Sequence, residues 1–367
     1  MDVTPEAGSA APSHSATAGS AAPSERGTAG PAWGGGGPAS AVSAAAITLD
    51  QVRKQYPDGT VAVGGLSLEV KAGELAVLIG PSGCGKSTVL RMINRLIEPT
   101  SGRILLGDED VTRTDAVDLR RRIGYVIQNV GLFPHQTIHA NVGTVPRLLG
   151  WSRARIRSRS EELLELVGLD PATFGHRYPH ELSGGQRQRV GVARALAADP
   201  VVLLMDEPFS AVDPIARGRL QEEFLRLQAE VRKTIVLVTH DLDEAVRLGD
   251  RIAVLSQGGS LEQYASPATL LGEPASPFVR EFVGDDRAIR RLAVTPITPE
   301  LLRPLASGEN TAGLPNVALG SSLYDALAVL LTTNSDDARV TAEGGEPVGL
   351  LSRHRILSID YPADAIG

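Results

Sequence analysis

Residues 80–88 read GPSGCGKST, and this stretch decides which fold the chain can adopt. It consists of Gly80, Pro81, Ser82, Gly83, Cys84, Gly85, Lys86, Ser87 and Thr88. The stretch fits the pattern G-x-x-x-x-G-K-[ST], between a short apolar run and an amphipathic stretch. Glycines let the backbone wrap phosphate groups, and the N-terminus of a following helix attracts negative charge. The pattern predicts a phosphate-binding loop in which Lys86 reaches the β- and γ-phosphates of a nucleotide and Ser87 binds Mg²⁺.

Four short apolar runs stand out along the chain, at 75–79, 201–205, 235–238 and 252–255. Their length and their lack of apolar–polar alternation indicate parallel strands that are buried on both faces. Helical patterns lie between them, with one apolar face formed by Val89, Leu90, Ile93, Leu96 and Ile97 and another by Val190, Ala193, Leu196 and Ala197. Strands that alternate with helices predict an α/β fold built on a parallel sheet.

The composition divides the 367 residues into parts. Residues 1–45 are nearly all Ala, Gly, Ser, Pro and Thr, so we expect a disordered low-complexity tail. The α/β part extends from 46 to 285 and contains a polar, Arg-rich helical insertion at about 136–190. A Pro-, Gly- and Thr-rich linker is expected at 286–315. Residues 316–367 indicate a small α/β unit with helices at 323–331 and 352–359 and strands at 338–341 and 347–351.

Charge and cysteine content limit the class of protein. The net charge of −7 argues against a nucleic-acid-binding protein, whose domains usually carry a basic face. Cys84 is the single cysteine, which excludes an intramolecular disulfide and fits a cytosolic location. No apolar run approaches the roughly 18 residues that a membrane-spanning helix needs. We therefore expect the chain to reach a membrane only through partner proteins.

An acidic pair follows the apolar run near residue 205, where Asp206 and Glu207 end the predicted strand. The end of a parallel strand places both carboxylates beside the phosphate-binding loop. Asp206 is suited to hold Mg²⁺ through water, and Glu207 is suited to accept a proton from an attacking water. This pair predicts hydrolysis of the bound nucleotide rather than binding alone.

A second anion-binding stretch follows Leu182 and consists of Ser183, Gly184, Gly185 and Gln186. It opens the helix that carries Val190, where the free N–H groups of a helix N-terminus meet an anion. With these motifs in this order, residues 46 to about 285 resemble the ATP-binding subunits of ABC transporters. The resemblance implies an α/β P-loop ATPase core with an N-terminal antiparallel β part, ATP and Mg²⁺ as ligands, and a head-to-tail homodimer. Each ATP would lie between the Lys86 loop of one subunit and the Ser183 stretch of the other.

The resemblance also assigns roles to residues outside these motifs. Tyr56 corresponds to the aromatic residue that stacks on adenine. Gln128 corresponds to the glutamine that senses Mg²⁺ and the attacking water and couples to the membrane subunits. Asp213 corresponds to an aspartate that links the two subunits, and His240 to the histidine that contacts the γ-phosphate.

Three further stretches are similar to the importer ATPases for quaternary-amine osmoprotectants such as glycine betaine, choline and carnitine. These read MINRLIEPTSG at 92–102, IGYVIQNVGLFPH at 123–135 and NVGTVPRLLGW at 141–151. The last two flank the surface that faces the permease in that family. The resemblance implies transmembrane permease subunits, indirectly an extracytoplasmic solute-binding protein, and a peripheral location on the cytoplasmic face of the plasma membrane. Residues 316–367 resemble a single CBS motif, whose sensing role is open because such importers often carry two.

Three alternatives are weighed against an osmoprotectant importer. An import ATPase for amino acids, polyamines or lipids would share every motif of the nucleotide site. A soluble ABC protein of translation or DNA repair usually carries two ATPase domains or a long coiled coil, which this chain lacks. A regulatory nucleotide-binding module without turnover would not need both Glu207 and His240. Uptake of labelled solutes separates the first alternative from the osmoprotectant interpretation.

Overall fold

The computed structural model describes residues 44–128, 130–210, 212–305, 311 and 313–358. The low-complexity tail predicted for residues 1–45 therefore lies almost entirely outside the described residues. Residue 359, the last of the helix predicted at 352–359, also lies outside them. Of the predicted tail, Ala45 is described, and its backbone N–H donates a hydrogen bond to the carbonyl of Val201.

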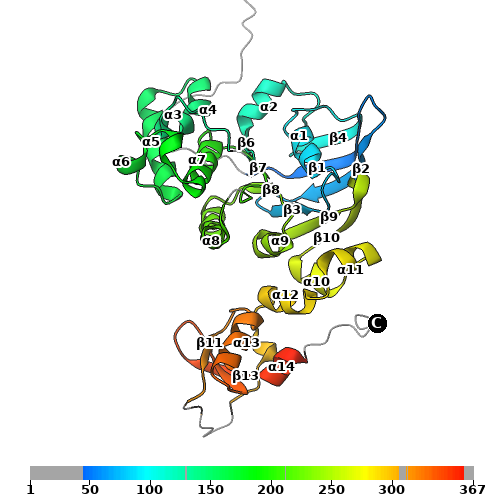
Figure 1. The fold of residues 1–367 in the computed structure, drawn as a ribbon, viewed down its shortest axis with the longest axis vertical. Helices are drawn as coiled ribbons and strands as arrows, with labels where there is room; N and C mark the ends of the chain where they lie inside the picture. The colour runs from blue at the N-terminus through cyan, green and yellow to red at the C-terminus, as the bar shows by residue number, and fades with distance from the viewer. Residues whose placement is uncertain (1–43, 129, 211, 306–310, 312, 359–367) are drawn as a thin grey trace, which may run out of the picture. The chain divides into compact units, whose positions relative to one another are not determined.

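A six-stranded sheet carries the phosphate-binding loop, and its strand order is β10-β9-β3-β8-β7-β6 (Figure 1). Its strands are β3 (Leu75–Ile79), β6 (Ile123–Val126), β7 (Val202–Asp206), β8 (Thr234–Val238), β9 (Arg251–Leu255) and β10 (Leu261–Ala265). Neighbouring strands are parallel except β10, which runs antiparallel to β9 at the edge. The four apolar runs are thus strands of one α/β sheet, as predicted. β6 and β10 were not predicted, because each is short and carries polar or glycine residues.

Alternate residues of the sheet pack into two cores, since successive side chains of a strand point to opposite faces. Leu75, Val77 and Ile79 of β3 belong to one core, and Ala76 and Leu78 belong to the other. The first core packs against helices that include α7 (Gly184–Leu196), α8 (Pro214–Val231), α9 (Leu242–Leu248), α10 (Pro267–Gly272) and α11 (Pro277–Val283). The second core packs against α1 (Lys86–Ile93).

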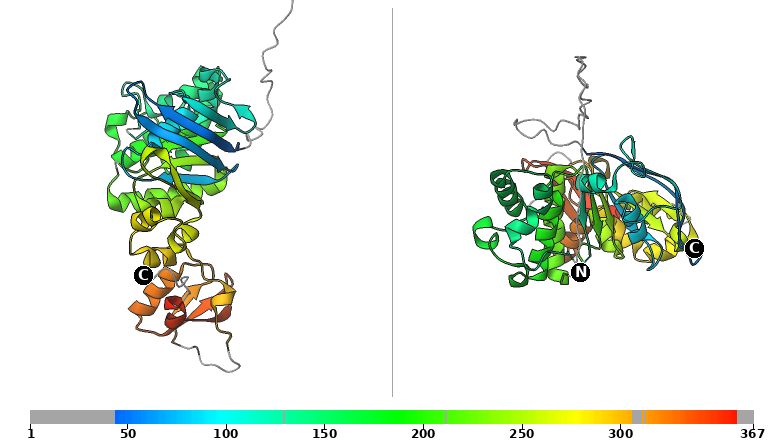
Figure 2. Two further views of the ribbon diagram at one scale, coloured as in Figure 1. Left: turned by 90° about the vertical axis from the view of Figure 1, so that its right-hand side faces the viewer. Right: turned by 90° about the horizontal axis from the view of Figure 1, so that it is seen from above.

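A separate antiparallel sheet closes the second core, with the order β2-β1-β4-β5. Its strands are β1 (Ile47–Gln55), β2 (Val61–Val70), β4 (Ser101–Leu106) and β5 (Glu109–Asp110). Figure 2 shows β1 and β2 of this sheet in blue. Helix α1 is therefore covered by the two sheets, which fixes the position of the loop at its N-terminus. This is the antiparallel β part that the resemblance implied.

Helices also make up the described chain between 136 and 190, which Figure 1 draws in green as one group. They are α3 (Ile138–Val142), α4 (Thr144–Leu148), α5 (Arg153–Leu166), α6 (Pro171–Phe174), the 3₁₀ turn η1 (Pro179–Glu181) and the start of α7. The remaining helices of this part are α2 (Ala116–Arg122), between β5 and β6, and the 3₁₀ turn η2 (Gln257–Gly259) before β10. No helix of the described chain is both long enough and apolar enough to cross a bilayer.

The helix predicted to bury Leu96 and Ile97 ends earlier than expected. Helix α1 stops at Ile93, Asn94 caps its C-terminus, and Arg95 adopts a left-handed φ of 50°. Leu96 is consequently 49% exposed, and Ile97 is only partly buried against the second core. The apolar spacing alone could not reveal this stop, because the turn at Arg95 is stabilised by distant partners, including a hydrogen bond from its guanidinium to the Thr114 carbonyl.

The C-terminal part has its own small core around a sheet of order β11-β12-β13. Its elements are α12 (Arg287–Val294), η3 (Pro299–Leu301), β11 (Asn316–Ala318), α13 (Leu323–Thr332), β12 (Asp337–Thr341), β13 (Pro347–Ser352) and α14 (Arg353–Leu357). The linker predicted at 286–315 is wrong in its first part, since α12 lies there and Leu292 and Ile297 are buried in this core. Sequence reasoning missed α12 because arginines separate its few apolar residues. The CBS-like identity of this unit stays a prediction.

Candidate functional site

The loop at 80–88 connects β3 to α1, and its glycines are required by close backbone contacts. Gly80 has a φ of 151°, and a Cβ there would lie 2.2 Å from the carbonyl oxygen of Leu255. Gly85 has a φ of 105°, and a Cβ there would lie 2.3 Å from the carbonyl oxygen of Ala62. Residues other than glycine rarely adopt such φ values. Both the backbone conformation and the lack of space for a Cβ therefore require glycine at these two positions.

Replacing Gly85 with Ala is expected to disrupt the loop, whereas Gly83→Ala is the matched control. Gly83 also has a positive φ, 79°, but a Cβ there meets nothing within 4 Å. We expect Gly83→Ala to lower the free energy of unfolding by about 1 kcal/mol, from strain alone. Gly85→Ala should lower it by about 3 kcal/mol or more and abolish ATP binding, because the backbone of β2 must move. Denaturant unfolding and a fluorescent-ATP titration measure both effects, and equal losses in the two variants would contradict this explanation.

Lys86 places its ammonium group inside the loop. The Nζ atom donates hydrogen bonds to the carbonyl oxygens of Gly80, at 2.7 Å, and of Pro81, at 3.0 Å. It also lies 3.7 Å from Sγ of Cys84, whose side chain is fully buried. Neutral carbonyls surround this buried cation, and among the described residues no carboxylate forms a salt bridge with it, so its charge is available to a phosphate.

Ser87 and Asp206 form the candidate Mg²⁺ site, and Gln128, the third residue expected to contact Mg²⁺, donates a hydrogen bond to Glu207. The Ser87 hydroxyl donates a hydrogen bond to Oδ1 of Asp206 at 2.9 Å, across from α1 to the end of β7. Burial raises the pKa of the Asp206 carboxyl, and the Ser87 hydrogen bond partly opposes this rise. Two adjacent hard oxygens fit Mg²⁺, which takes one or two protein ligands and completes its shell with phosphate and water. Groups of three or more His, Cys, Asp or Glu side chains that could hold a metal do not occur among the described residues.

Glu207 lies between Gln128 and His240. Its Oε2 accepts a hydrogen bond from Nε2 of Gln128 at 2.8 Å, and its Oε1 lies 3.3 Å from Nδ1 of His240. The backbone of Glu207 adopts a left-handed φ of 47°, and its N–H donates to the carbonyl of Val238 on β8. The chain therefore turns sharply at the end of β7 and brings together residues from three strand ends. All three were predicted from the sequence.

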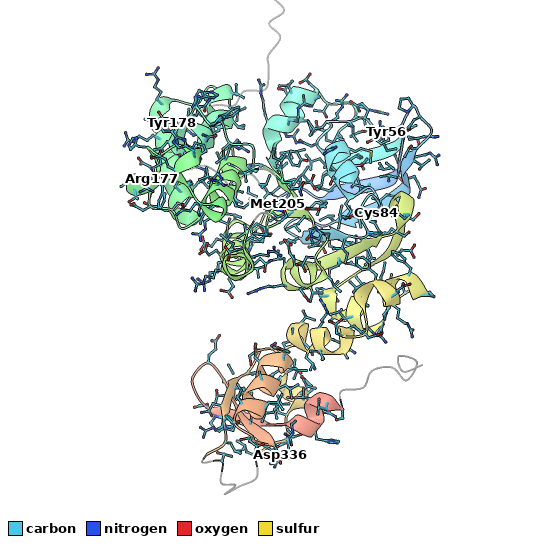
Figure 3. All side chains as sticks on the ribbon, viewed as in Figure 1. Tyr56, Cys84, Arg177, Tyr178, Met205 and Asp336 are labelled. Carbon is cyan, nitrogen blue, oxygen red and sulfur yellow. The ribbon has the colours of Figure 1, made fainter. Side chains whose placement is uncertain are left out.

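Tyr56 follows β1 in the tight turn to β2. Its ring is 36% exposed, and Nζ of Lys54 lies 5.4 Å from the ring centroid. The backbone N–H of Tyr56 donates to the carbonyl of Thr60, which closes the turn. An exposed, held ring offers a flat face for a base, as the adenine-stacking prediction requires. Figure 3 labels Tyr56 and, separately, Cys84 of the loop.

Ser183, Gly184, Gly185 and Gln186 start α7 and form a second, separate candidate site. The Ser183 hydroxyl accepts a hydrogen bond from the N–H of Gln186, and the Gln186 side chain accepts one from the N–H of Ser183. This capping box holds the N-terminus of α7 in place. The stretch lines a hollow of about 340 Å³ together with Asp213 and Arg189. The structure thus joins Asp213 to the second candidate site. In Figure 3 the labelled Tyr178, which precedes this stretch, lies among the green helices, away from Cys84 and Met205.

Sequence reasoning missed Glu244 on α9. Its side chain is almost fully buried, and Oε2 accepts a hydrogen bond from the Thr239 hydroxyl at 2.8 Å. That hydroxyl in turn accepts from the N–H of Asp241, so Glu244 supports both neighbours of His240. Burial raises the pKa of Glu244 to about 7, and nearby Asp241 adds to this rise. A single glutamate between Asp243 and Ala245 gives no sign of such burial in the sequence.

Glu244→Gln is expected to stabilise the protein increasingly as the pH rises. The pKa of Glu244 is about 7 in the folded chain, against an ordinary value of 4.5 for a glutamate in the unfolded chain. The folded state therefore keeps a proton that the unfolded state loses, and wild-type stability falls between pH 4.5 and 7. Glutamine has no proton to lose, so the variant should gain about 3 kcal/mol at pH 8 relative to low pH. Denaturant unfolding at pH 5 and pH 8, with exposed Glu222→Gln as control, tests this; a pH-independent difference would contradict it.

The glycine loop, the acidic pair and the histidine after β8 together define a P-loop nucleotide-binding protein. The family model described as ABC transporter matches residues 63–210. The osmoprotectant import ATP-binding protein OsmV of Salmonella typhimurium is 50% identical over 313 residues, which cover 84% of this chain and 79% of OsmV. The glycine betaine uptake system ATP-binding protein YehX of Escherichia coli is 47% identical over 79% of this chain and 92% of its own. The chain belongs to the ABC transporter family of ATP-binding proteins.

Other relatives agree with this assignment. The glycine betaine/carnitine/choline transport ATP-binding protein OpuCA of Bacillus subtilis is 54% identical over 66% of this chain, which spans 64% of that protein's length. The dimeric structure of MJ0796, a bacterial ABC transporter cassette, covers 60% of this chain at 36% identity, with a TM-score of 0.55 and 98% of its own chain matched. The same cassette bound to ADP and Pi gives a TM-score of 0.54 at 35% identity. The family predicted from the motifs is confirmed.

Proposed function

We propose that this protein is the ATP-hydrolysing subunit of an importer for quaternary-amine osmoprotectants such as glycine betaine, choline or carnitine. The observation that carries the hydrolytic part is the cluster of Gln128, Glu207 and His240 beside the Ser87–Asp206 pair. The substrate class rests on the relatives, whose printed names include osmoprotectants, glycine betaine, carnitine and choline.

Hydrolysis is assigned to the residues of the cluster as follows. Lys86 and the N–H groups of the loop bind the β- and γ-phosphates. Glu207 accepts the proton of a water that attacks the γ-phosphorus, while the bond to the bridging β–γ oxygen breaks. Gln128 and His240 orient Glu207 through the contacts they already make with its carboxylate. Mg²⁺ held at Ser87 and Asp206 would neutralise charge on the phosphates.

The proposal includes a head-to-tail homodimer that closes on ATP. The Ser183 stretch and Asp213 line a hollow of their own, which holds none of the residues of the Lys86 loop. A second copy can bring that hollow to the γ-phosphate bound by the first copy. A phosphate bridged by two subunits favours closure, and its loss after hydrolysis favours opening.

Permease subunits complete the proposed assembly. The peripheral location on the cytoplasmic face of the membrane and the indirect role of a solute-binding protein belong to the same proposal. Exposed apolar side chains lie on the helical part, at Leu148 and Leu149, and on either side of Gln128, at Ile127 and Phe133. A protein partner would cover such residues. Solute choice then belongs to the permease and the solute-binding protein.

Uptake of labelled glycine betaine by the source cells under salt stress tests the substrate class. The comparison is wild type against a chromosomal Glu207→Gln replacement. Uptake should collapse in the variant, and unlabelled choline or carnitine should compete in the wild type. A variant that loses uptake of an amino acid or a polyamine while glycine betaine uptake persists would contradict the substrate class and leave the ATPase assignment in place.

A further inference from the structure

Arg194 connects the helix that carries the Ser183 stretch to the loop that carries Gln128. It lies near the C-terminal end of α7, opposite Ser183, and its guanidinium is half-buried. Nη1 donates a hydrogen bond to the carbonyl oxygen of Gly131 at 2.6 Å, and Nη2 donates one to that of Val130 at 2.5 Å. We propose that Arg194 is a positioning residue, through which the location of α7 sets how closely Gln128 approaches Glu207. This inference rests on the proposed ATPase function.

The loop after Gln128 needs external support to keep its conformation. Val130 and Gly131 both adopt left-handed backbone angles, with φ values of 51° and 58°. Such a conformation is strained for a β-branched residue such as valine, and it persists only where the surroundings hold it. The two hydrogen bonds from Arg194 go to the carbonyls of these two residues. Arg194 thus stabilises the strained part of the loop directly.

Packing against α7 adds to these hydrogen bonds. A Cβ at Gly191, one turn before Arg194, would lie 2.6 Å from Cγ1 of Val130. Glycine therefore lets the buried Val130 side chain rest on the backbone of the helix. The loop is held to α7 both by apolar contact and by the guanidinium, so the two elements should move together.

The partners of Arg194 indicate why this position needs an arginine: the geometry of its two hydrogen bonds matters, rather than an ion pair. Among the described residues, no carboxylate forms a salt bridge with Arg194, and burial lowers its pKa. A charge that is partly removed from water without a counter-ion costs stability. Its fork of two donors, however, matches two carbonyl oxygens at once, which a lysine ammonium cannot reproduce.

The far end of the same loop is held to a second helix. The fully buried Asn141 of α3 donates from Nδ2 to the carbonyls of Phe133, Gln136 and Thr137, and its Oδ1 accepts from the N–H of Phe133. The chain from 130 to 137 is therefore fixed to the helical part at both ends. Gln128 lies just before this segment and contacts Glu207, so it stands where the helical part meets the catalytic cluster.

Steady-state ATPase assays of the full chain with Arg194→Met and Arg194→Lys test the inference. A misplaced Gln128 should lower kcat by about tenfold in Arg194→Met, with KM for ATP within about twofold of wild type. Arg194→Lys, which can supply one of the two hydrogen bonds, should recover part of the rate. Arg153→Met, at an exposed arginine of α5, is the control for loss of charge. Thermal unfolding identifies any variant that has lost its fold, in which case the lysine variant carries the comparison.

A double-mutant cycle with Gln128→Ala separates positioning from a merely structural role. If Arg194 acts through Gln128, its replacement should change kcat by less than about twofold once the glutamine is absent. An equal fold-loss in kcat with and without Gln128 would overturn the inference, as would a raised KM with unchanged kcat. If Glu207→Gln hydrolysed ATP as fast as wild type, the proposed function would be contradicted instead. Failure of the inference about Arg194 and failure of the proposed function are therefore distinguishable.

Discussion

Replacing Glu207 with Gln is expected to lower kcat for ATP hydrolysis by at least about 100-fold, while ATP affinity stays within about twofold of wild type. The amide keeps the shape of the side chain and can still contact Gln128 and His240. It cannot accept the proton of the attacking water, so only the chemical step is lost. Oε2 of Glu207 lies 2.8 Å from Nε2 of Gln128, and Oε1 lies 3.3 Å from Nδ1 of His240. Glu207 is not one of the residues assigned to bind the phosphates, so ATP affinity should be kept.

Phosphate release and a fluorescent-ATP titration, both on purified full chain, measure the two quantities. Glu69→Gln, at an exposed glutamate of β2, removes the same charge away from the cluster and should leave both quantities unchanged. Residual turnover in Glu207→Gln near the wild-type rate would show that another group accepts the proton, and the assignment of Glu207 would fail.

Lys86→Met is expected to weaken ATP binding itself, by about 10- to 100-fold, because a charge-assisted contact to the phosphates is lost. The ammonium group now rests on the carbonyls of Gly80 and Pro81, and methionine fills a similar volume without a donor. Turnover should fall as well, since the same charge stabilises the transferring phosphoryl group.

Lys71→Met provides the matched comparison, because Lys71 is an exposed lysine just after β2. ATP binding should be unchanged in that variant at moderate ionic strength. If Lys86→Met bound ATP as tightly as Lys71→Met does, the loop at 80–88 would not be the phosphate site.

Much of the site could be predicted because its chemistry is local in the sequence. Gly80, Gly85, Lys86 and Ser87 lie in one loop, and Asp206 and Glu207 end one strand. The apolar runs predicted β3, β7 and β8 correctly because these strands are buried on both faces and so contain few polar residues. For these features, whose residues are close together in the sequence, the sequence pattern and the structure agree.

The features that were missed depend on contacts between distant residues. Arg194 acts on a loop more than 60 positions away in the chain, and Glu244 is buried by the packing of α9. The early stop of α1 and the helix α12 likewise depend on tertiary contacts that override weak local preference. Apolar periodicity predicts which face of a helix is buried, but not where the helix ends or which elements it packs against.

The most direct test of the central claim is the molar mass of Glu207→Gln in solution with and without ATP, measured by light scattering. Blocked hydrolysis should hold ATP between two copies, so we expect a doubling of molar mass that requires ATP and disappears when Ser183 is also replaced by Arg. A chain that stays monomeric with saturating ATP, or that dimerises equally well without it, would contradict an ATPase that works by closing a nucleotide sandwich.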